Sequence, residues 1–115
     1  MKIFVVNKHL NALCLHIADM CKEKYGDDVT ILNEHHFPMN KPDELDDKHF
    51  KIYLCGESIK LIAEADIVLF DSGYRNSKEA IMLKNFCLEH DIVCKYIKPF
   101  YYYDKKRCRV RWFIT

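Results

Sequence analysis

The most constraining feature of the sequence is a set of short, uninterrupted apolar runs separated by longer amphipathic stretches. Residues 2–6 and 67–70 are the clearest runs, and residues 29–32 and 92–97 resemble them. Strands that are apolar on both faces are typical of parallel sheets covered by helices on both sides. The runs are far shorter than the roughly 20 residues needed to cross a bilayer. The pattern therefore predicts an α/β domain with a mostly parallel sheet and no membrane partner.

Three stretches between these runs have helical periodicity. Residues 9–25 repeat apolar side chains at the spacing of an amphipathic helix, and Gly26 suits its C-terminal cap. Residues 48–65 and 77–90 are the other predicted helices, and Ser77 is a candidate N-cap. The side chains expected to face inward are Leu54, Cys55, Ile59, Ile62 and Ala63 in the second helix and Ala80, Leu83 and Cys87 in the third.

The C-terminal segment does not follow this alternation of strand and helix patterns. Lys105-Lys106 is a predicted turn, and residues 107–115 then alternate with period two, which predicts a strand. One face of that strand is apolar, and the other carries Arg107, Arg109 and Arg111. An arginine row of this kind suits phosphate or a protein partner, whereas a charged edge strand that discourages aggregation is the favoured alternative.

Length and charge limit the classes of protein that remain possible. The 115 residues suit a single domain over 1–115, which we divide into a core of residues 1–97 and an extension of residues 98–115. Residues 1–103 carry 13 basic and 16 acidic side chains (−3), whereas residues 104–115 carry five basic and one acidic (+4). The total of +1 excludes a globally basic nucleic-acid binder but leaves a local cationic segment.

The six cysteines are interpreted as reduced thiols, because they form no Cys-x-x-Cys pair and most lie within apolar patterns. Cys87, His90 and Cys94 are metal-ligand types at helical spacing, but a fourth ligand is not evident, so no metal site is predicted. The N-terminus begins with a strand pattern instead of a signal peptide. We therefore expect a cytoplasmic protein.

The predicted ligand site lies beyond the carboxyl ends of the strands, where open parallel sheets bind ligands. Asn7 and His9 follow the first strand. The better candidate follows the third strand and comprises Asp71, Ser72, Gly73, Tyr74 and Ser77. A helix start at Ser77 favours phosphate or another anion. The alternative is that Ser77 only caps its helix and Gly73 only makes a turn.

Residues 65–80 resemble the nucleoside 2-deoxyribosyltransferase-like superfamily, especially its small bacterial and phage proteins of unknown function. The family pattern is an Ala/Cys-Asp pair, a buried strand, Gly-Trp, and a Ser-x-Gly-Ala segment that opens a helix. Here Ala65-Asp66, Gly73-Tyr74, Ser77 and Ala80 follow that pattern, with Tyr in place of Trp. The resemblance implies a flavodoxin-like three-layer fold and a nucleotide-type ligand, and it leaves a homo-oligomer open.

The acids that perform catalysis in that family are not matched. Leu83 stands at the position of the nucleophilic glutamate, and Ser58 stands at the position of an aspartate found in hydrolase members. Glu79 replaces a family glycine and is the candidate substitute acid, because glycosyl transfer needs a carboxylate. The resemblance therefore leaves enzymatic activity open.

Three functions follow, and none of them calls for a cofactor. The primary expectation is a deoxyribosyltransferase-like protein that binds a nucleotide or related phosphorylated small molecule, with degenerate catalysis. The second is an active nucleoside or nucleotide N-glycosidase or deoxyribosyltransferase that uses Glu79. The third is an interaction module for protein or nucleic acid on the C-terminal arginine strand, with nucleic acid the less favoured partner.

Overall fold

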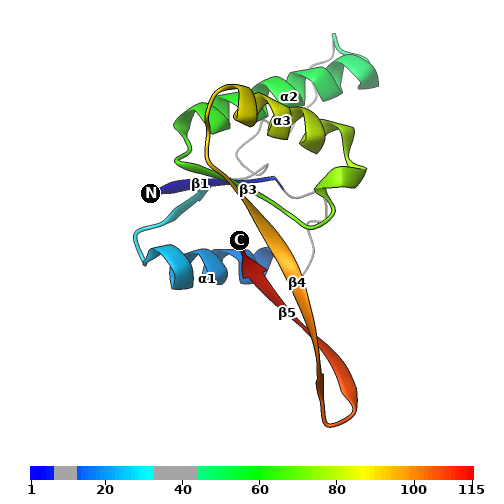
Figure 1. Cartoon of the computed structure of the whole chain (residues 1–115). Helices are drawn as coiled ribbons and strands as arrows, with labels where there is room; N and C mark the ends of the chain where they lie inside the picture. Colours follow the sequence, from blue (N-terminus) through cyan, green and yellow to red (C-terminus); the bar gives the residue numbers. More distant parts are fainter. Residues whose placement is uncertain (7–12, 33–43) are drawn as a thin grey trace.

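The computed structural model of the chain describes residues 1–6, 13–32 and 44–115. Within these ranges it contains one five-stranded sheet, three α-helices and a short 3-10 helix (Figure 1). In chain order the elements are β1 (Lys2–Val6), α1 (Leu13–Tyr25), β2 (Thr30–Leu32), α2 (Asp47–Glu64), β3 (Ile67–Phe70), the 3-10 helix η2 (Tyr74–Asn76), α3 (Lys78–Glu89), β4 (Cys94–Asp104) and β5 (Arg107–Ile114).

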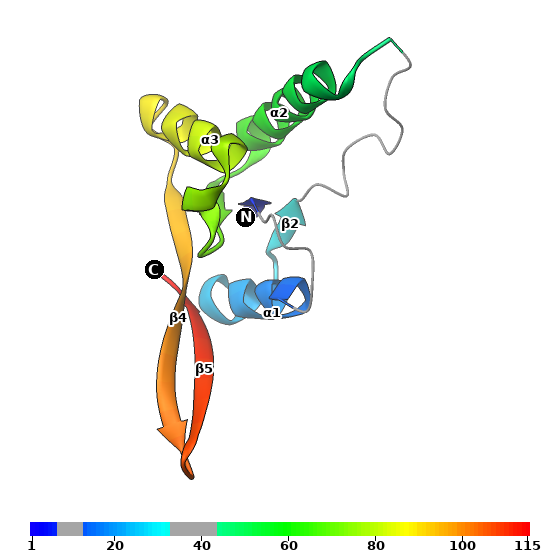
Figure 2. The same ribbon diagram turned by 90° about the vertical axis from the view of Figure 1, so that its right-hand side faces the viewer.

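The sheet has the strand order β2-β1-β3-β4-β5. β1 pairs in parallel with β2 and β3, and β3 pairs in parallel with β4, whereas β5 is antiparallel to β4. The sheet is strongly curled, as Figure 2 shows most clearly. The predicted α/β class, the mostly parallel sheet and the added C-terminal strand are confirmed.

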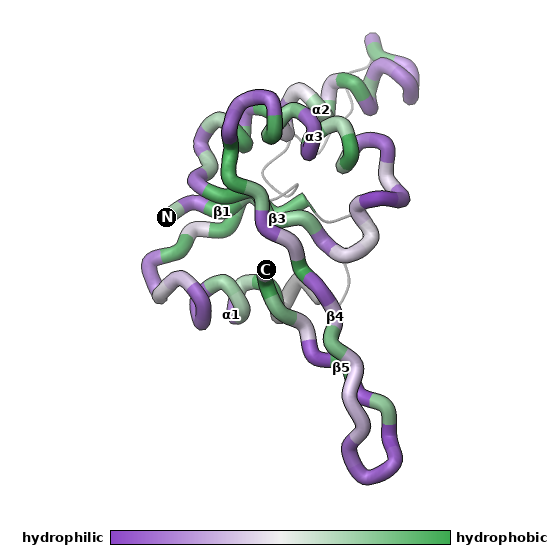
Figure 3. Tube along the Cα trace, viewed as in Figure 1, coloured by the Kyte–Doolittle hydropathy of each residue, from purple (hydrophilic) through white to green (hydrophobic). Residues whose placement is uncertain are grey.

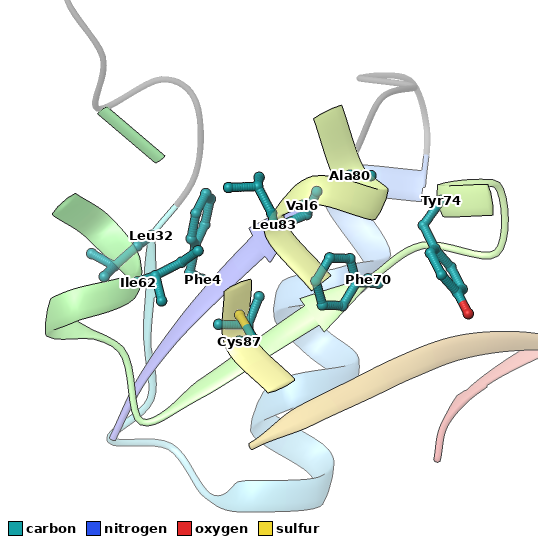
Figure 4. Close-up of a cluster of buried hydrophobic side chains, with 10 residues drawn as sticks. Phe4, Val6, Leu32, Ile62, Phe70, Tyr74, Ala80, Leu83 and Cys87 are labelled. Carbon is teal, nitrogen blue, oxygen red and sulfur yellow. The ribbon is translucent and has the colours of Figure 1, made fainter. Parts of the chain in front are cut away.

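The two faces of the sheet bury separate hydrophobic clusters. Alternate residues of a strand point to opposite faces, so Phe4 and Val6 join one cluster while Ile3 and Val5 join the other. α2 and α3 cover the first face, and α1 covers the second (Figure 1, Figure 2). Figure 4 shows the first cluster, to which α3 contributes Leu83. The described helices therefore flank the sheet on both sides, which explains why its central strands are continuously apolar.

The inner face of α3 is the predicted one, since Ala80, Leu83 and Cys87 are all buried. The prediction for α2 is wrong at Ala63, which is exposed, whereas Leu61 packs against the core. Successive helical residues are about 100° apart, and the buried pair Ser58 and Ile62 sets the direction of the inner face. Ala63 points away from that face. Leu54 and Cys55 are half-buried at its margin, and Ile59 packs against the cluster.

β4 is longer than its apolar pattern predicts, because it continues through Pro99 to Asp104. β3 pairs with β4 only as far as Tyr96, so one edge of β4 is unpaired beyond that point. Proline is tolerated on such an edge because its missing N–H breaks no ladder bond. The predicted turn at Lys105-Lys106 is confirmed, and both residues have positive φ (49° and 64°), as tight two-residue hairpin turns require.

Hydropathy follows the same architecture. Figure 3 shows hydrophobic residues along β1 and β3, a mixture along β4 and β5, and hydrophilic residues at the tip of the β4–β5 hairpin. All five cysteines whose side chains the structure describes are free thiols. Among the described helices, none combines the length and apolar character that a membrane span requires.

Candidate functional site

An open cleft of about 520 Å³ lies beyond the carboxyl end of β3, between α3 and β4. Its position agrees with the predicted ligand site after the third strand. Its lining combines aromatic rings with three cations and comprises Asp71, Ser72, Tyr74, Arg75, Lys84, Tyr96, Ile97, Lys98 and Pro99.

Tyr74 is the central side chain of this cleft. Its ring packs against the rings of Phe70 and Tyr96, with centroid distances of 5.6 and 5.4 Å. The residue is 9% exposed and belongs to the hydrophobic cluster beneath α3. Figure 4 shows the ring beside Phe70 with its hydroxyl directed away from the cluster. The core therefore fixes the ring and leaves the hydroxyl at the cleft.

Two cations converge on the Tyr74 hydroxyl. Arg75 Nε donates a hydrogen bond to it at 3.2 Å, and Lys84 Nζ donates another at 3.1 Å. The hydrogen bond from Arg75, and then that from Lys84, lowers the pKa of Tyr74. In return, the hydrogen bond to Tyr74 raises the pKa values of both Arg75 and Lys84. The phenol thus holds two positive charges side by side.

Aromatic rings form a second wall of the same cleft. Lys84 Nζ lies 5.0 Å from the ring centroid of Tyr74 and 5.6 Å from that of Tyr96. Both distances are within the range of cation–π attraction. Burial raises the pKa of Tyr96, so its phenol stays neutral to higher pH than usual. Lys98, which is exposed on β4, adds a third cation to the rim.

The loop between β3 and η2 is held by its own side chains. Asp71 is buried, and its Oδ1 accepts a hydrogen bond from the Gly73 N–H at 3.0 Å. The Tyr74 N–H donates to the Asp71 carbonyl. Gly73 has a φ of −92°, so this turn does not require glycine's left-handed conformation. Asp71 therefore shapes the loop that places Ser72 and Tyr74 in the cleft.

Ser77 lies outside the cleft lining and caps α3. Its Oγ accepts a hydrogen bond from the Ala80 N–H at 3.3 Å, and it donates one to Glu79 Oε2 at 3.2 Å. The Glu79 carboxylate also lies at the helix N-terminus, where the helix dipole favours negative charge. These contacts match the capping alternative for Ser77.

Glu79 and the cleft belong to different sides of α3. Glu79 precedes Lys84 by five positions, which places the two side chains about 140° apart around the helix. Burial, and then the charge of Glu79, raises the pKa of Cys55 on α2, whereas Glu79 itself is exposed and does not line the cleft. Leu83 and Ser58, the two positions that the sequence comparison aligned with catalytic acids, are both buried.

The remaining predicted residues lie elsewhere. Asn7 and His9 fall outside the described residues. Arg107, Arg109 and Arg111 are exposed on β5, away from the cleft lining, and Arg109 Nε lies 3.5 Å from Asp104 Oδ2. In the described parts of the chain, no group of three or more His, Cys, Asp and Glu side chains could hold a metal ion.

Sequence reasoning missed six residues of the cleft lining, namely Arg75, Lys84, Tyr96, Ile97, Lys98 and Pro99. Lys84 follows Ala80 by four positions and so lies on a neighbouring part of the α3 surface, beside the core stripe. Tyr96 and Lys98 are two positions apart on β4 and share a face of that strand. The sequence shows these spacings, but it does not show which residue of another element each side chain contacts.

Comparison with protein-family models, curated proteins and solved structures gives no match to this chain.

Proposed function

We propose that this chain is a flavodoxin-like, nucleoside 2-deoxyribosyltransferase-like protein that binds a nucleotide or related phosphorylated small molecule. The observation that carries the proposal is the convergence of Arg75 and Lys84 on Tyr74, beside the ring of Tyr96. Such a cleft offers cations for a phosphate and an aromatic surface for a planar base.

In this proposal the phosphate binds to the cationic side of the cleft. Arg75 and Lys84 each use one N–H to hold the Tyr74 hydroxyl and retain further donors for a ligand. Lys98 approaches from β4. The Tyr74 hydrogen bonds keep the two cations close together before the ligand arrives, which reduces the ordering cost of binding.

In this proposal the protein binds the nucleotide but does not cleave its glycosidic bond. Glu79 is exposed at the start of α3, where it accepts a hydrogen bond from the Ser77 hydroxyl, and it is absent from the cleft lining. Leu83 provides no carboxylate, and the Ser58 hydroxyl donates to the Leu54 carbonyl at 3.1 Å. A carboxylate at the sugar carbon, which cleavage needs, is therefore not supplied from these three positions.

Calorimetric titration with nucleoside monophosphates, the matching nucleosides and inorganic phosphate tests the proposal. We expect monophosphates to bind more tightly than nucleosides or phosphate alone. Lys84→Gln should raise the monophosphate Kd by about ten- to hundred-fold, the usual cost of losing a hydrogen bond to a charged group. The matched control is Lys78→Gln, an exposed lysine on the same helix that does not line the cleft.

Two outcomes would count against the proposal. One is a failed binding test, in which either no monophosphate binds or the affinity falls equally in Lys84→Gln and Lys78→Gln. The other is release of free base from deoxynucleoside monophosphates by the wild type, abolished in Glu79→Gln. The second outcome would establish glycosidic cleavage and assign it to Glu79.

A further inference from the structure

The β4–β5 hairpin extends well beyond the body of the protein. Its strands pair from Ile97 opposite Ile114 to Asp104 opposite Arg107, whereas β3 contacts β4 only as far as Tyr96. In both ribbon views the outer half of the hairpin has no other described element beside it (Figure 1, Figure 2). An isolated two-stranded hairpin is marginally stable in water, so this half lacks the cover that such strands usually need.

The two faces of the hairpin differ in charge. Residues opposite each other on paired strands share a face. The apolar hairpin face consists of the pairs Ile97–Ile114, Pro99–Trp112, Tyr101–Val110 and Tyr103–Cys108. The cationic hairpin face consists of the pairs Lys98–Phe113, Phe100–Arg111, Tyr102–Arg109 and Asp104–Arg107. Every charged residue of β4 and β5 that takes part in these pairs therefore lies on one face.

The apolar hairpin face is the outward continuation of the protein core. Ile97 is fully buried in the cluster beneath α1, and Trp112 packs at the edge of that cluster. Farther out, Val110 is 42% exposed, Tyr101 66% and Tyr103 82%. The core of this chain covers the inner half of the face and leaves the outer half uncovered.

We infer that a second copy of this chain covers the outer half, in a two-fold symmetric dimer whose apolar hairpin faces pack against each other. An uncharged face meets an identical face without electrostatic repulsion, and the cationic faces then point outward. A nucleic acid would instead need the cationic hairpin face. The segregation of charge thus favours another copy of the chain at the apolar face.

The alternative dimer, in which two β5 edges pair with each other, is disfavoured by its charges. β5 is the edge strand of the sheet. Antiparallel pairing centred on Arg109 would place Arg109 opposite its own copy and Arg107 opposite Arg111. Like charges directly opposite each other destabilise a strand pair. The arginine row therefore disfavours pairing between two β5 edges and leaves face-to-face packing open.

The available area is sufficient for a specific interface. Aromatic side chains bury about 150–250 Å² each, so the uncovered part of this face offers on the order of 500 Å² per chain. Two copies would bury about 1,000 Å², the lower limit for a specific contact.

Sedimentation velocity from about 1 to about 100 μM protein tests the inference, because this range brackets dissociation constants expected for a small interface. The wild type should dimerise, and the dimer should persist in about 1 M salt, where the screening length is about 3 Å. Tyr101→Ser with Tyr103→Ser should weaken dimerisation at least about tenfold. Tyr102→Ser is the matched control, because Tyr102 lies on the cationic hairpin face of the same strand.

A second readout uses the single tryptophan and does not depend on any variant. Trp112 lies on the apolar hairpin face, so its fluorescence should shift to shorter wavelength as the wild type dimerises. The inference is overturned if the wild type stays monomeric throughout the range, or if the dimer dissociates in high salt. It is equally overturned if Tyr102→Ser weakens the dimer as much as the double variant, or if dimerisation leaves the Trp112 emission unchanged.

Discussion

At the scale of single residues, Tyr74 joins the core to the cleft. Its ring is held by Phe70 and Tyr96, and its hydroxyl accepts hydrogen bonds from Arg75 and Lys84. A tryptophan at this position would carry an indole N–H, which can only donate a hydrogen bond. Tyrosine therefore permits what tryptophan would not, namely the gathering of two cations around one oxygen.

The lowered pKa of Tyr74 predicts a pH-dependent contribution to stability. Its folded pKa lies below the ordinary value of 10.0, so the folded state loses this proton at lower pH than the unfolded state. The contribution should be fully present above pH 10, and it should be lost as pH falls through the folded pKa. Tyrosinate absorbance should show one phenol that titrates early in the wild type.

Tyr74→Phe should abolish that early titration and flatten the rise in stability toward pH 10, whereas Tyr101→Phe, at an exposed position, should change neither. An early phenol that survives in Tyr74→Phe would disprove the assignment.

At the scale of elements, different parts of α3 have different roles. One side carries Lys84 to the cleft, and the helix start carries the Ser77 cap with Glu79. From the sequence, the phosphate site is predicted at the Ser77 helix start, and Lys84 is missed. Helical rotation places Glu79 and Lys84 about 140° apart, so the helix start and the cleft are separate places on α3.

Ser77→Ala tests this separation of tasks. Loss of the N-cap should lower the free energy of unfolding by about 1 kcal/mol. The Kd for a nucleoside monophosphate should stay within about twofold, because a residue that makes no ligand contact leaves binding energy unchanged. Chemical denaturation and calorimetric titration of the same variant measure the two quantities. A large loss of affinity without loss of stability would instead place Ser77 on the ligand.

The elements themselves were largely predictable from local pattern, and the cleft was predictable only in part. Strand β3 and the inner face of α3 were correct because uninterrupted apolar runs and i, i+3, i+4 spacing report burial directly. Asp71, Ser72 and Tyr74 were found because the loop after β3 is local. Lys84 was missed because its contact with Tyr74 spans ten positions and depends on how α3 packs on the sheet. The extension of β4 was missed because Pro99 interrupts the pattern that identifies a strand.

At the scale of the whole molecule, charge is segregated between the body and the hairpin. The near-neutral total conceals a cationic hairpin face that lies opposite an apolar one. The arginines on this face lie on the edge strand β5, and protection of that edge is the role that the sequence predicts for them. The kind of partner that this hairpin can bind therefore depends on which of its two faces the partner contacts.

Replacing that charge tests the protective role. Arg109→Thr with Arg111→Thr keeps strand-forming residues on β5 but removes two of its three arginines. We expect species larger than a dimer at about 100 μM and low salt, detected by light scattering, because edge-to-edge pairing then adds to face-to-face packing. Lys78→Thr, which removes a charge far from this edge, is the control. Equal scattering from both variants would argue against the protective role.

The position of β1 in the sheet also has a consequence for synthesis on the ribosome. β1 lies between β2 and β3, yet Ile3 pairs with Ile67, which is made 64 positions later (67 minus 3). At about 5–20 residues per second, β1 waits roughly 3 to 13 s for this partner. During that interval an apolar strand has one complete edge unpaired, which is the condition under which nascent chains aggregate or recruit chaperones. Among the strand pairs of the described sheet, β1 and β3 are thus the two partners farthest apart along the sequence.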